Sequence, residues 1–157
     1  MKLHPQDSAP TGGHHYPLRV YYEDTDAGGV VYHANYLRFC ERARTEAMRD
    51  AAIPHAEMTS QHGLMFMVRR VKLDYLAPAL LDDSLLVVTR PLKVGAASAT
   101  ILQVVRRADA ARGLVRVEIE LACVRMGDQR AARMPARYRE VLVGLMDGHD
   151  SAPIGAF

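Results

Sequence analysis

The hydrophobic pattern of this chain changes its period at residue 35, and that change constrains the fold more than any other feature. From there to about residue 51, apolar residues recur at spacings of three and four: Tyr36, Phe39, Cys40, Ala43, Ala47 and Met48. Charged residues fill the other side, which is typical of an amphipathic helix with one buried face. We expect Asn35 to cap its start and Pro54 to limit its end, because the residue before a proline avoids helical angles.

Around this helix the apolar residues alternate with a period of two. Strands are predicted over residues 16–23, 64–76, 84–94, 97–108 and 113–126, and a second helix over residues 135–146. The predicted order is one strand, then a helix, then four strands joined by short connections. This order indicates the α+β class, with one antiparallel sheet packed on one main helix. A single helix covers only part of such a sheet, so a protomer is expected to pair with a copy of itself.

Length and composition favour one globular domain. Of the 157 residues, 16–146 are predicted to form the domain, between a disordered leader (1–15) and a flexible tail (147–157). The net charge of +2 and the scattered arginines do not call for nucleic acid as a partner. No apolar run approaches the roughly 18 residues of a membrane span, and the first residues lack the apolar region of a signal peptide. We expect a cytoplasmic protein.

The two cysteines fit that expectation. Cys40 and Cys123 lie far apart in the sequence, each among apolar residues. A disulfide framework requires more cysteines and a secretory context. Both residues are therefore predicted to be reduced, buried and structural.

The segment before the main helix concentrates the residue types that chemistry needs. Three acidic residues fall within residues 23–26, and Gly28, Gly29 and His33 follow. The first N–H groups of a helix lack intrahelical partners, so they stabilise anions and developing oxyanions. A carboxylate beside such groups is a minimal arrangement for acyl transfer, in which Asp26 attacks the carbonyl or activates water.

Other interpretations of the same residues remain open. Asp26 could simply cap the helix, and glycine pairs are common in turns. A calcium loop is disfavoured, because its fifth and twelfth positions would be Gly28 and Asn35 instead of oxygen-bearing ligands that end in a bidentate glutamate. The glycines are not followed by the Lys-Ser or Lys-Thr of a phosphate loop, and the chain has neither a G-x-S-x-G nor an H-E-x-x-H motif. We expect no metal site.

The longest motif is VYYEDTDAGGVVYHANYLRFCERARTE, at residues 20–46. It resembles the signature of the YbgC-type acyl-CoA thioesterases, which belong to the 4-hydroxybenzoyl-CoA thioesterase branch of the hotdog fold. The resemblance continues through residues 66–83 and the later strands, so it covers almost the whole chain apart from its two ends. It implies a hotdog fold, in which an antiparallel five-stranded sheet wraps round one long helix. It also implies homodimers or homotetramers with sites between protomers.

The resemblance further implies a role for each residue of the loop. Asp26 matches the catalytic carboxylate, as nucleophile or as general base, and His33 and Tyr22 match the residues that accompany it. The backbone N–H of His33 falls where the family polarises the thioester carbonyl. Substrate binding is expected of Gly28, Gly29, Val30 and Tyr32. Taken alone, Tyr22 could instead pack in the core, and His33 could instead hold the loop by a hydrogen bond.

The implied reaction is hydrolysis of an acyl-CoA to the free acid and coenzyme A, so coenzyme A is part of the substrate and no cofactor is expected. The sequence leaves the acyl group open among short, long and aromatic ones; residues 65–67 are candidates for a tunnel. Candidates for binding the phosphates are Arg69, Arg70, Lys72, Lys93 and Arg106. One alternative substrate is a thioester of acyl carrier protein. Another function is an interaction protein of the cell-envelope Tol-Pal or phospholipid-synthesis machinery, recruited to the inner face of the membrane. A hotdog dehydratase fits the EDTDAGG loop poorly.

Overall fold

A computed structural model describes residues 12–146 of the chain. In chain order the elements are β1 (His14–Arg19), the 3-10 helix η2 (Tyr22–Asp24), α1 (Asn35–Asp50), α2 (His55–His62), β2 (Leu64–Tyr75), β3 (Ser84–Val94), β4 (Ser98–Arg107), β5 (Gly113–Arg125) and α3 (Ala136–Met146). Residues 1–11 of the leader predicted for residues 1–15, and the whole tail predicted for residues 147–157, lie outside the described residues.

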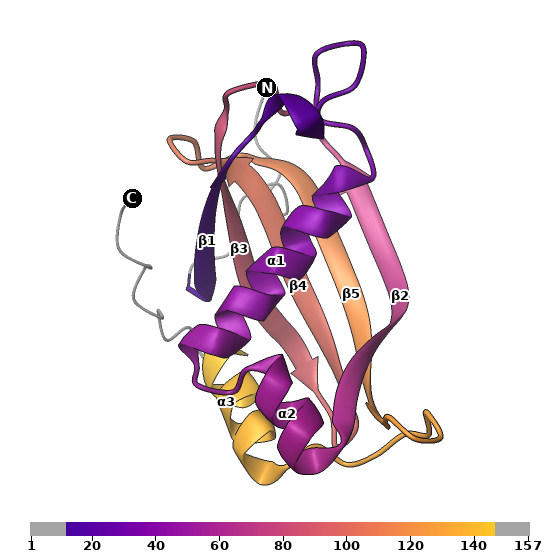
Figure 1. Cartoon of the computed structure of the whole chain (residues 1–157). Coiled ribbons are helices and arrows are strands. Elements are labelled where there is room, and N and C mark those ends of the chain that lie inside the picture. The colour runs from indigo at the N-terminus through magenta and orange to yellow at the C-terminus, as the bar shows by residue number, and fades with distance from the viewer. Residues whose placement is uncertain (1–11, 147–157) are drawn as a thin grey trace.

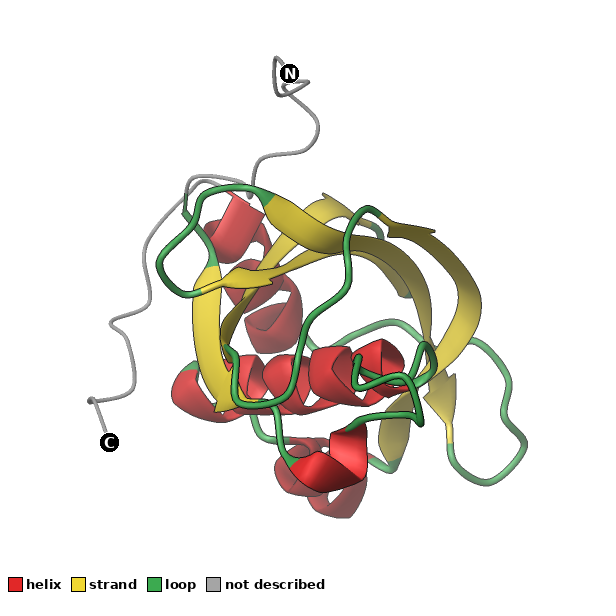
Figure 2. Ribbon diagram, turned by 90° about the horizontal axis from the view of Figure 1, so that it is seen from above, coloured by secondary structure: helices red, strands yellow, loops and turns green. Residues whose placement is uncertain are grey.

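The strands form one sheet in the order β1-β3-β4-β5-β2, and every neighbouring pair is antiparallel. Figure 1 shows α1 lying across this sheet, with β1 and β2 at its two edges. Seen from above, the strands curve around the helical layer (Figure 2). The predicted α+β class and the hotdog arrangement, an antiparallel five-stranded sheet around one long helix, are confirmed.

The buried face of α1 is the predicted one. All six apolar residues of the pattern between Tyr36 and Met48 are at most 7 % exposed. The predicted capping by Asn35 is wrong: Ala34 occupies the N-cap position, and the Asn35 side-chain amide donates to the Asp24 carbonyl at 2.9 Å. The helix ends at Asp50, shortly before a positive φ and a proline interrupt helical geometry.

The first strand is shifted relative to its prediction over residues 16–23. β1 begins at His14, inside the segment predicted as leader, and ends at Arg19. His14 is buried, and its Nε2 lies 2.7 Å from Oδ2 of Asp50 at the end of α1. The residues after β1 turn instead of extending, because the Asp24 carboxylate accepts from the Tyr21 N–H at 2.8 Å and stabilises η2.

The helix α2 was not predicted from the sequence. Its apolar pattern is weak, since Met58 is its one buried residue. The residues that flank α2 determine where it begins and ends. Pro54 precedes its first turn, and Gly63 follows its last turn in the left-handed conformation, with a φ of +62°. The N–H of Gly63 donates to carbonyls of the last turn. The remaining strands and α3 lie within two residues of their predicted bounds.

The core lies between α1 and the concave side of the sheet. The predicted inward face of β5 is buried throughout: Val115, Val117, Ile119, Leu121 and Cys123. Cys40 and Cys123 are both buried free cysteines, as predicted. Among residues 12–146, no helix has the length and apolarity that a membrane crossing requires.

Candidate active site

The loop between η2 and α1 has a fixed backbone. The Asp26 N–H donates to the Val30 carbonyl at 2.9 Å, and the Asp26 carbonyl accepts from the Gly29 N–H at 3.0 Å. Thr25 and Val31 pair as a short antiparallel bridge that closes the loop. Gly29 has a φ of +78°, and a Cβ there would meet nothing within 4 Å. The backbone angle, and not a close neighbour within the chain, therefore requires this glycine.

The side chain of Asp26 is exposed on this loop and is oriented by its own turn. Its Oδ1 accepts from the Gly28 N–H at 2.8 Å. Its Oδ2 has no hydrogen-bond partner in the described part of the chain. Asp26 thus stabilises its own loop and does not cap α1, and the capping alternative is wrong. An oriented carboxylate with one free oxygen can act on a bound substrate or a water molecule.

Asp24 joins the loop to the start of α1. Its carbonyl accepts from the Tyr32 N–H and from the Asn35 side-chain amide, each at 2.9 Å. A second anchor is the buried hydroxyl of Tyr36, which accepts from the Ala79 N–H at 3.1 Å. The pKa of Tyr36 is raised, mainly because its side chain is buried. Asp24 is therefore a structural residue of this turn, through both its carboxylate and its carbonyl.

His33 offers two different groups at the start of α1. Its imidazole is exposed, and the ring centroid lies 4.5 Å from that of Tyr32. Its carbonyl accepts a hydrogen bond from the Tyr75 hydroxyl at 2.8 Å. Its backbone N–H has no hydrogen-bond partner within residues 12–146. The peptide unit that bears this N–H is fixed separately, because its Tyr32 carbonyl accepts from the Asn35 N–H at 2.9 Å. The His33 N–H is thus oriented and stays available, and the role of Tyr75 was not found from the sequence.

The other predicted site residues share the same loop. Tyr22 is 83 % exposed, so the alternative that it packs in the core is wrong. Val30 is half-buried and bridges to Leu80, whereas Tyr32 is exposed. Between residues 12 and 146, no hydrogen bond joins the side chains of the three predicted catalytic residues. The roles predicted for them stay predictions.

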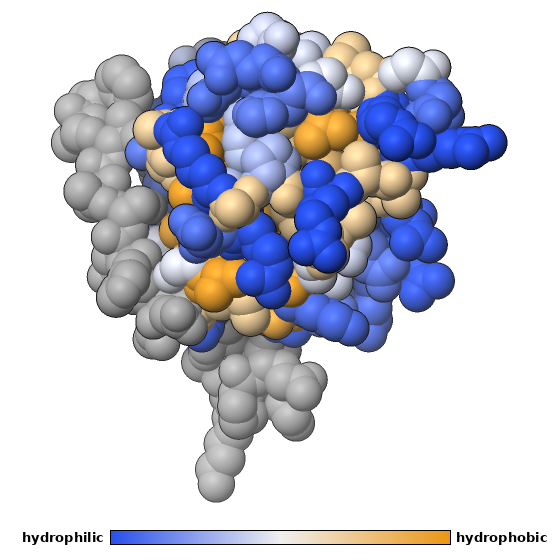
Figure 3. Space-filling model, turned by 90° about the horizontal axis from the view of Figure 1, so that it is seen from below, coloured by the Kyte–Doolittle hydropathy of each residue, from blue (hydrophilic) through white to orange (hydrophobic). Residues whose placement is uncertain are grey.

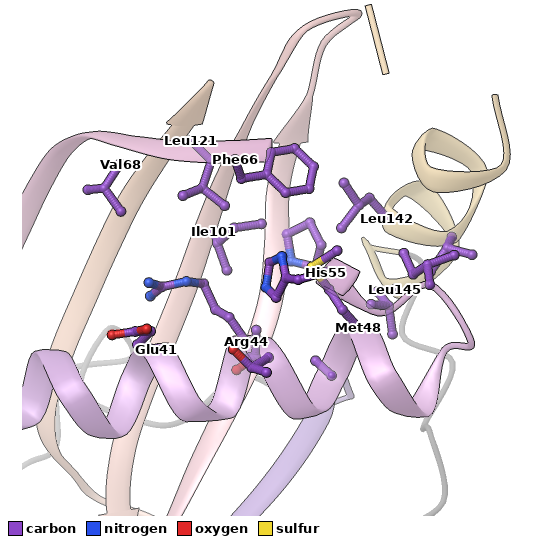
Figure 4. A pocket seen from close by; sticks show the side chains of 16 residues that line it. Glu41, Arg44, Met48, His55, Phe66, Val68, Ile101, Leu121, Leu142 and Leu145 are labelled. Carbon is purple, nitrogen blue, oxygen red and sulfur yellow. The ribbon is translucent and has the colours of Figure 1, made fainter. Parts of the chain in front are cut away.

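A pocket of about 360 Å³ lies farther along α1. Its lining is largely apolar and includes Met48, Ile53, Phe66, Ile101, Leu121 and Leu142. Figure 4 shows Arg44 from α1 and His55 from α2 pointing into it. The pKa of His55 is lowered, first because the ring is buried and second by the positive charge of Arg44. No residue predicted for the active site lines this pocket, and of residues 65–67 only Phe66 does.

Two of the basic candidates for phosphate binding are engaged within the chain. The Arg106 guanidinium donates to three backbone carbonyls, and Arg70 pairs with Glu120 at 3.4 Å. Arg69, Lys72 and Lys93 are exposed. Among residues 12–146, no group of three His, Cys, Asp or Glu side chains could hold a metal ion.

The fold and the loop at the amino end of α1 define the class of protein. The sequence model of the thioesterase-like superfamily matches residues 20–142. The acyl-CoA thioesterase YbgC of Haemophilus influenzae is 42 % identical over 127 residues, which are 81 % of this chain and 92 % of that protein. The chain therefore belongs to the YbgC acyl-CoA thioesterase family of this superfamily.

Solved structures agree with this assignment. A probable thioesterase from Bartonella henselae is 33 % identical with a TM-score of 0.73, over 78 % of this chain and 98 % of that one. A 1,4-dihydroxy-2-naphthoyl-CoA thioesterase from Synechocystis has a TM-score of 0.77 at 24 % identity, over 83 % of this chain and 96 % of that one. The second similarity shows the shared fold alone.

Proposed function

We propose that this chain, a thioester hydrolase by family, hydrolyses acyl-CoA with Asp26 as its nucleophile or general base. One observation carries the proposal: the exposed Asp26 carboxylate keeps one oxygen free on the same fixed loop that presents the unpaired His33 N–H. A base and an oxyanion donor are thus held together at the positive end of a helix.

In the proposed mechanism the thioester carbonyl oxygen accepts a hydrogen bond from the His33 N–H. Asp26 then attacks the carbonyl carbon, or removes a proton from a water molecule that attacks it. The oxyanion is stabilised by about 3 kcal/mol per donor in comparable sites. The carbon–sulfur bond breaks and the coenzyme A thiolate leaves. Because a thiolate leaves readily, no strong general acid is needed. The reaction consumes one water molecule, which in the nucleophilic route hydrolyses the mixed anhydride between Asp26 and the acyl group and so restores the carboxylate.

Several neighbours support this chemistry. The Asn35 N–H fixes the peptide unit that bears the His33 N–H by donating to the Tyr32 carbonyl, and Tyr75 holds the next unit by donating to the His33 carbonyl. The His33 N–H therefore does not have to reorganise during the reaction. We assign the His33 ring and the Tyr22 hydroxyl to positioning water or the thioester. Gly28, Gly29, Val30 and Tyr32 lie on the same loop and are proposed to contact the substrate.

We also propose that the chain works as a homodimer or a homotetramer, paired through β2. β2 is 12 residues long, lies at the edge of the sheet and pairs only with β5 among the described strands. Along its length it exposes three apolar or aromatic side chains, Val68, Val71 and Tyr75, at 39–54 %. A long edge strand with exposed apolar residues is a template for pairing with another chain. On the face of the molecule seen from below, hydrophobic side chains form only small patches among hydrophilic ones where they are visible (Figure 3), which makes that face a poorer candidate.

An antiparallel pairing of β2 with its copy would also combine the two sites. Phe66 and Val68, in the first half of β2, line the pocket, whereas Tyr75, at its end, donates to the His33 carbonyl. In a two-fold antiparallel pair, the start of one β2 faces the end of the other. Each catalytic loop would then lie beside the pocket of the other protomer. A β2 pair thus offers a physical route to sites between protomers.

The function is tested by measuring thiol release from short, long and aromatic acyl-CoA esters. We expect wild type to hydrolyse some of them and Asp26→Asn to lose nearly all of that rate. The asparagine keeps an oxygen for the Gly28 N–H, so the loop should stay folded. Asp109→Asn, in an exposed turn, is the control and should match wild type. Thiol release that is absent in wild type, or equal in Asp26→Asn, contradicts the proposal. Acyl carrier protein as acyl carrier, interaction with envelope proteins and location in the cytoplasm stay predictions.

Sedimentation equilibrium tests the pairing. Val71→Lys places a charge on the proposed interface and should shift wild-type dimers toward monomers. Leu92→Lys, at an exposed position on β3, should leave the mass unchanged. A wild-type protein that is monomeric and fully active would show that β2 is not an interface and that one chain forms the site.

A further inference from the structure

Arg44 is an unusual residue for the wall of an apolar pocket. It is half-buried and projects from α1 among aliphatic side chains (Figure 4). Its one hydrogen bond in the described part of the chain runs from Nη1 to Gln103 Oε1 at 2.9 Å. It forms no ion pair with any carboxylate of residues 12–146. A guanidinium carries five N–H donors, so most of its donors remain available.

Gln103 holds the guanidinium in place. This glutamine is fully buried, and its amide donates to the Cys40 carbonyl at 2.8 Å and to the Thr89 hydroxyl at 3.0 Å. Both donor bonds fix the side chain, so its oxygen can only face Arg44. The arginine is thus oriented by a buried polar network and is not a solvated side chain that bends over the surface.

Arg44 has no directly bonded anion at the pocket. Glu41 also lines the pocket and its charge acts on Arg44, but its side chain is exposed, and no hydrogen bond or ion pair joins it to Arg44. His55 faces the same space, and its lowered pKa, caused first by burial, favours the uncharged ring. Removing a cation from water is costly unless an anion pairs with it. The missing partner must fit a cavity of about 360 Å³ with aliphatic walls.

We propose that this pocket binds an apolar chain that ends in a carboxylate. The carboxylate pairs with the Arg44 guanidinium, whose planar fork matches two carboxylate oxygens. The chain contacts the aliphatic lining, which includes Met48, Ile101 and Leu142. The size of the cavity suits a small ligand.

Two sources can supply this chemistry. One is a free carboxylic acid, such as the product of hydrolysis. The other is the far end of a dicarboxylic acyl group whose thioester lies at a catalytic loop. The second source deepens the proposed function and rests on it, whereas the first does not depend on catalysis.

Calorimetric titration with sodium octanoate and with octan-1-ol tests the site. Wild type should bind octanoate at least about tenfold more tightly than the alcohol, because a charged hydrogen bond is lost in the alcohol. Arg44→Met should abolish the difference. The variant leaves the buried Gln103 oxygen without its partner, so its fold is checked by thermal unfolding before binding is compared. Arg42→Met, on the exposed side of α1, is the matched control and should behave as wild type. Equal binding of the acid and the alcohol to wild type would overturn the proposal.

Methyl NMR locates the ligand on the wild-type protein and so does not depend on any variant. Octanoate should shift the Met48 methyl signal, because Met48 lines the pocket. The exposed Met126, at the end of β5, should not respond. A response of Met126 without Met48 would place the binding elsewhere and refute the assignment.

The two sources are separated by comparing adipoyl-CoA with hexanoyl-CoA, which have the same chain length. A kcat/KM that favours adipoyl-CoA in wild type but not in Arg44→Met identifies the dicarboxylic substrate. Equal kcat/KM values for the two esters, with octanoate still shifting the Met48 signal, identify the free acid as the ligand. If neither ester is hydrolysed while octanoate still binds, the proposed function fails and the pocket stands. If wild type hydrolyses both esters at equal kcat/KM and does not bind octanoate, the pocket proposal fails.

Discussion

The loop at the amino end of α1 presents a free peptide N–H and an oriented carboxylate, whereas the carboxyl-terminal half of α1 contributes side chains to an apolar pocket. At the amino end, the loop around Asp26 is exposed and is held by hydrogen bonds between its own peptides. Farther along, Arg44 and His55 project between the helix and the sheet into an apolar pocket. The first region is polar and fixed by local turns, and the second is apolar and assembled from distant segments.

This difference suggests a division of labour along one helix. In the proposed mechanism, a peptide N–H and an oriented carboxylate act on the thioester group, which is the same in every acyl-CoA. Side chains in a cavity contact the part of a ligand that varies. Changes at the amino end should therefore alter the rate for every ester alike, and changes at the pocket should alter the preference among esters.

The largest expected effect is that of Asp26→Asn on kcat. Loss of the general base or nucleophile should reduce kcat by about 10²–10⁴-fold, and by a similar factor for each ester of a series. Steady-state kinetics on esters of several chain lengths measures this. Should the variant also reverse the order of preference, the loop would contribute to specificity and the proposed division would be wrong.

The next effect concerns the anchor at the opposite end of the helix. Asp50→Ala removes the partner of the buried His14, which should lower the free energy of unfolding by about 1–3 kcal/mol. Urea denaturation checks this, with Asp109→Ala as a control on an exposed turn. The kcat of the folded variant should stay within twofold of wild type, on the order of the scatter for surface changes. Unchanged stability would mean that the His14–Asp50 contact does not anchor β1.

A smaller effect is expected from Tyr75→Phe. The variant loses the hydrogen bond to the His33 carbonyl, worth about 1 kcal/mol, so kcat should fall by up to about tenfold with little change in KM. Tyr16→Phe, on β1, tests whether loss of any tyrosine hydroxyl has this effect. A change in KM alone would assign Tyr75 to substrate binding instead of to positioning of the peptide.

The smallest effect is the pH dependence contributed by His55. Its pKa in the folded protein is lowered from 6.5, first by burial and then by the charge of Arg44. The unfolded chain then binds more protons, so this contribution to stability is complete above pH 6.5 and is lost as the pH falls through the lowered pKa. His55→Gln should therefore lose less stability than wild type between pH 7 and pH 5. Parallel pH profiles from thermal unfolding would show that His55 does not titrate differently on folding.

Most of the fold could be predicted from periodicity, because long elements with one buried face record that face in their spacing. This held for α1, for β5 and for the bounds of β3. It failed for α2, whose single buried residue leaves no period, and for the first strand, where hydrogen bonding by Asp24 favours a turn over extended backbone. The position of Asn35 as a helix residue, and not its cap, also depended on a partner elsewhere in the loop.

The sequence by itself determined the order of the strands, α1 and α3, and the loop that carries Asp26, Gly29 and His33, because these depend on residues close to one another in the chain. Only the tertiary structure decided which strand holds the His33 carbonyl, that Arg44 and His55 line one cavity, and that Gln103 orients Arg44. The contact from Tyr75 to His33 spans 42 positions, and that from Arg44 to Gln103 spans 59. Contacts of that separation arise from how the sheet closes round α1, which no local pattern encodes.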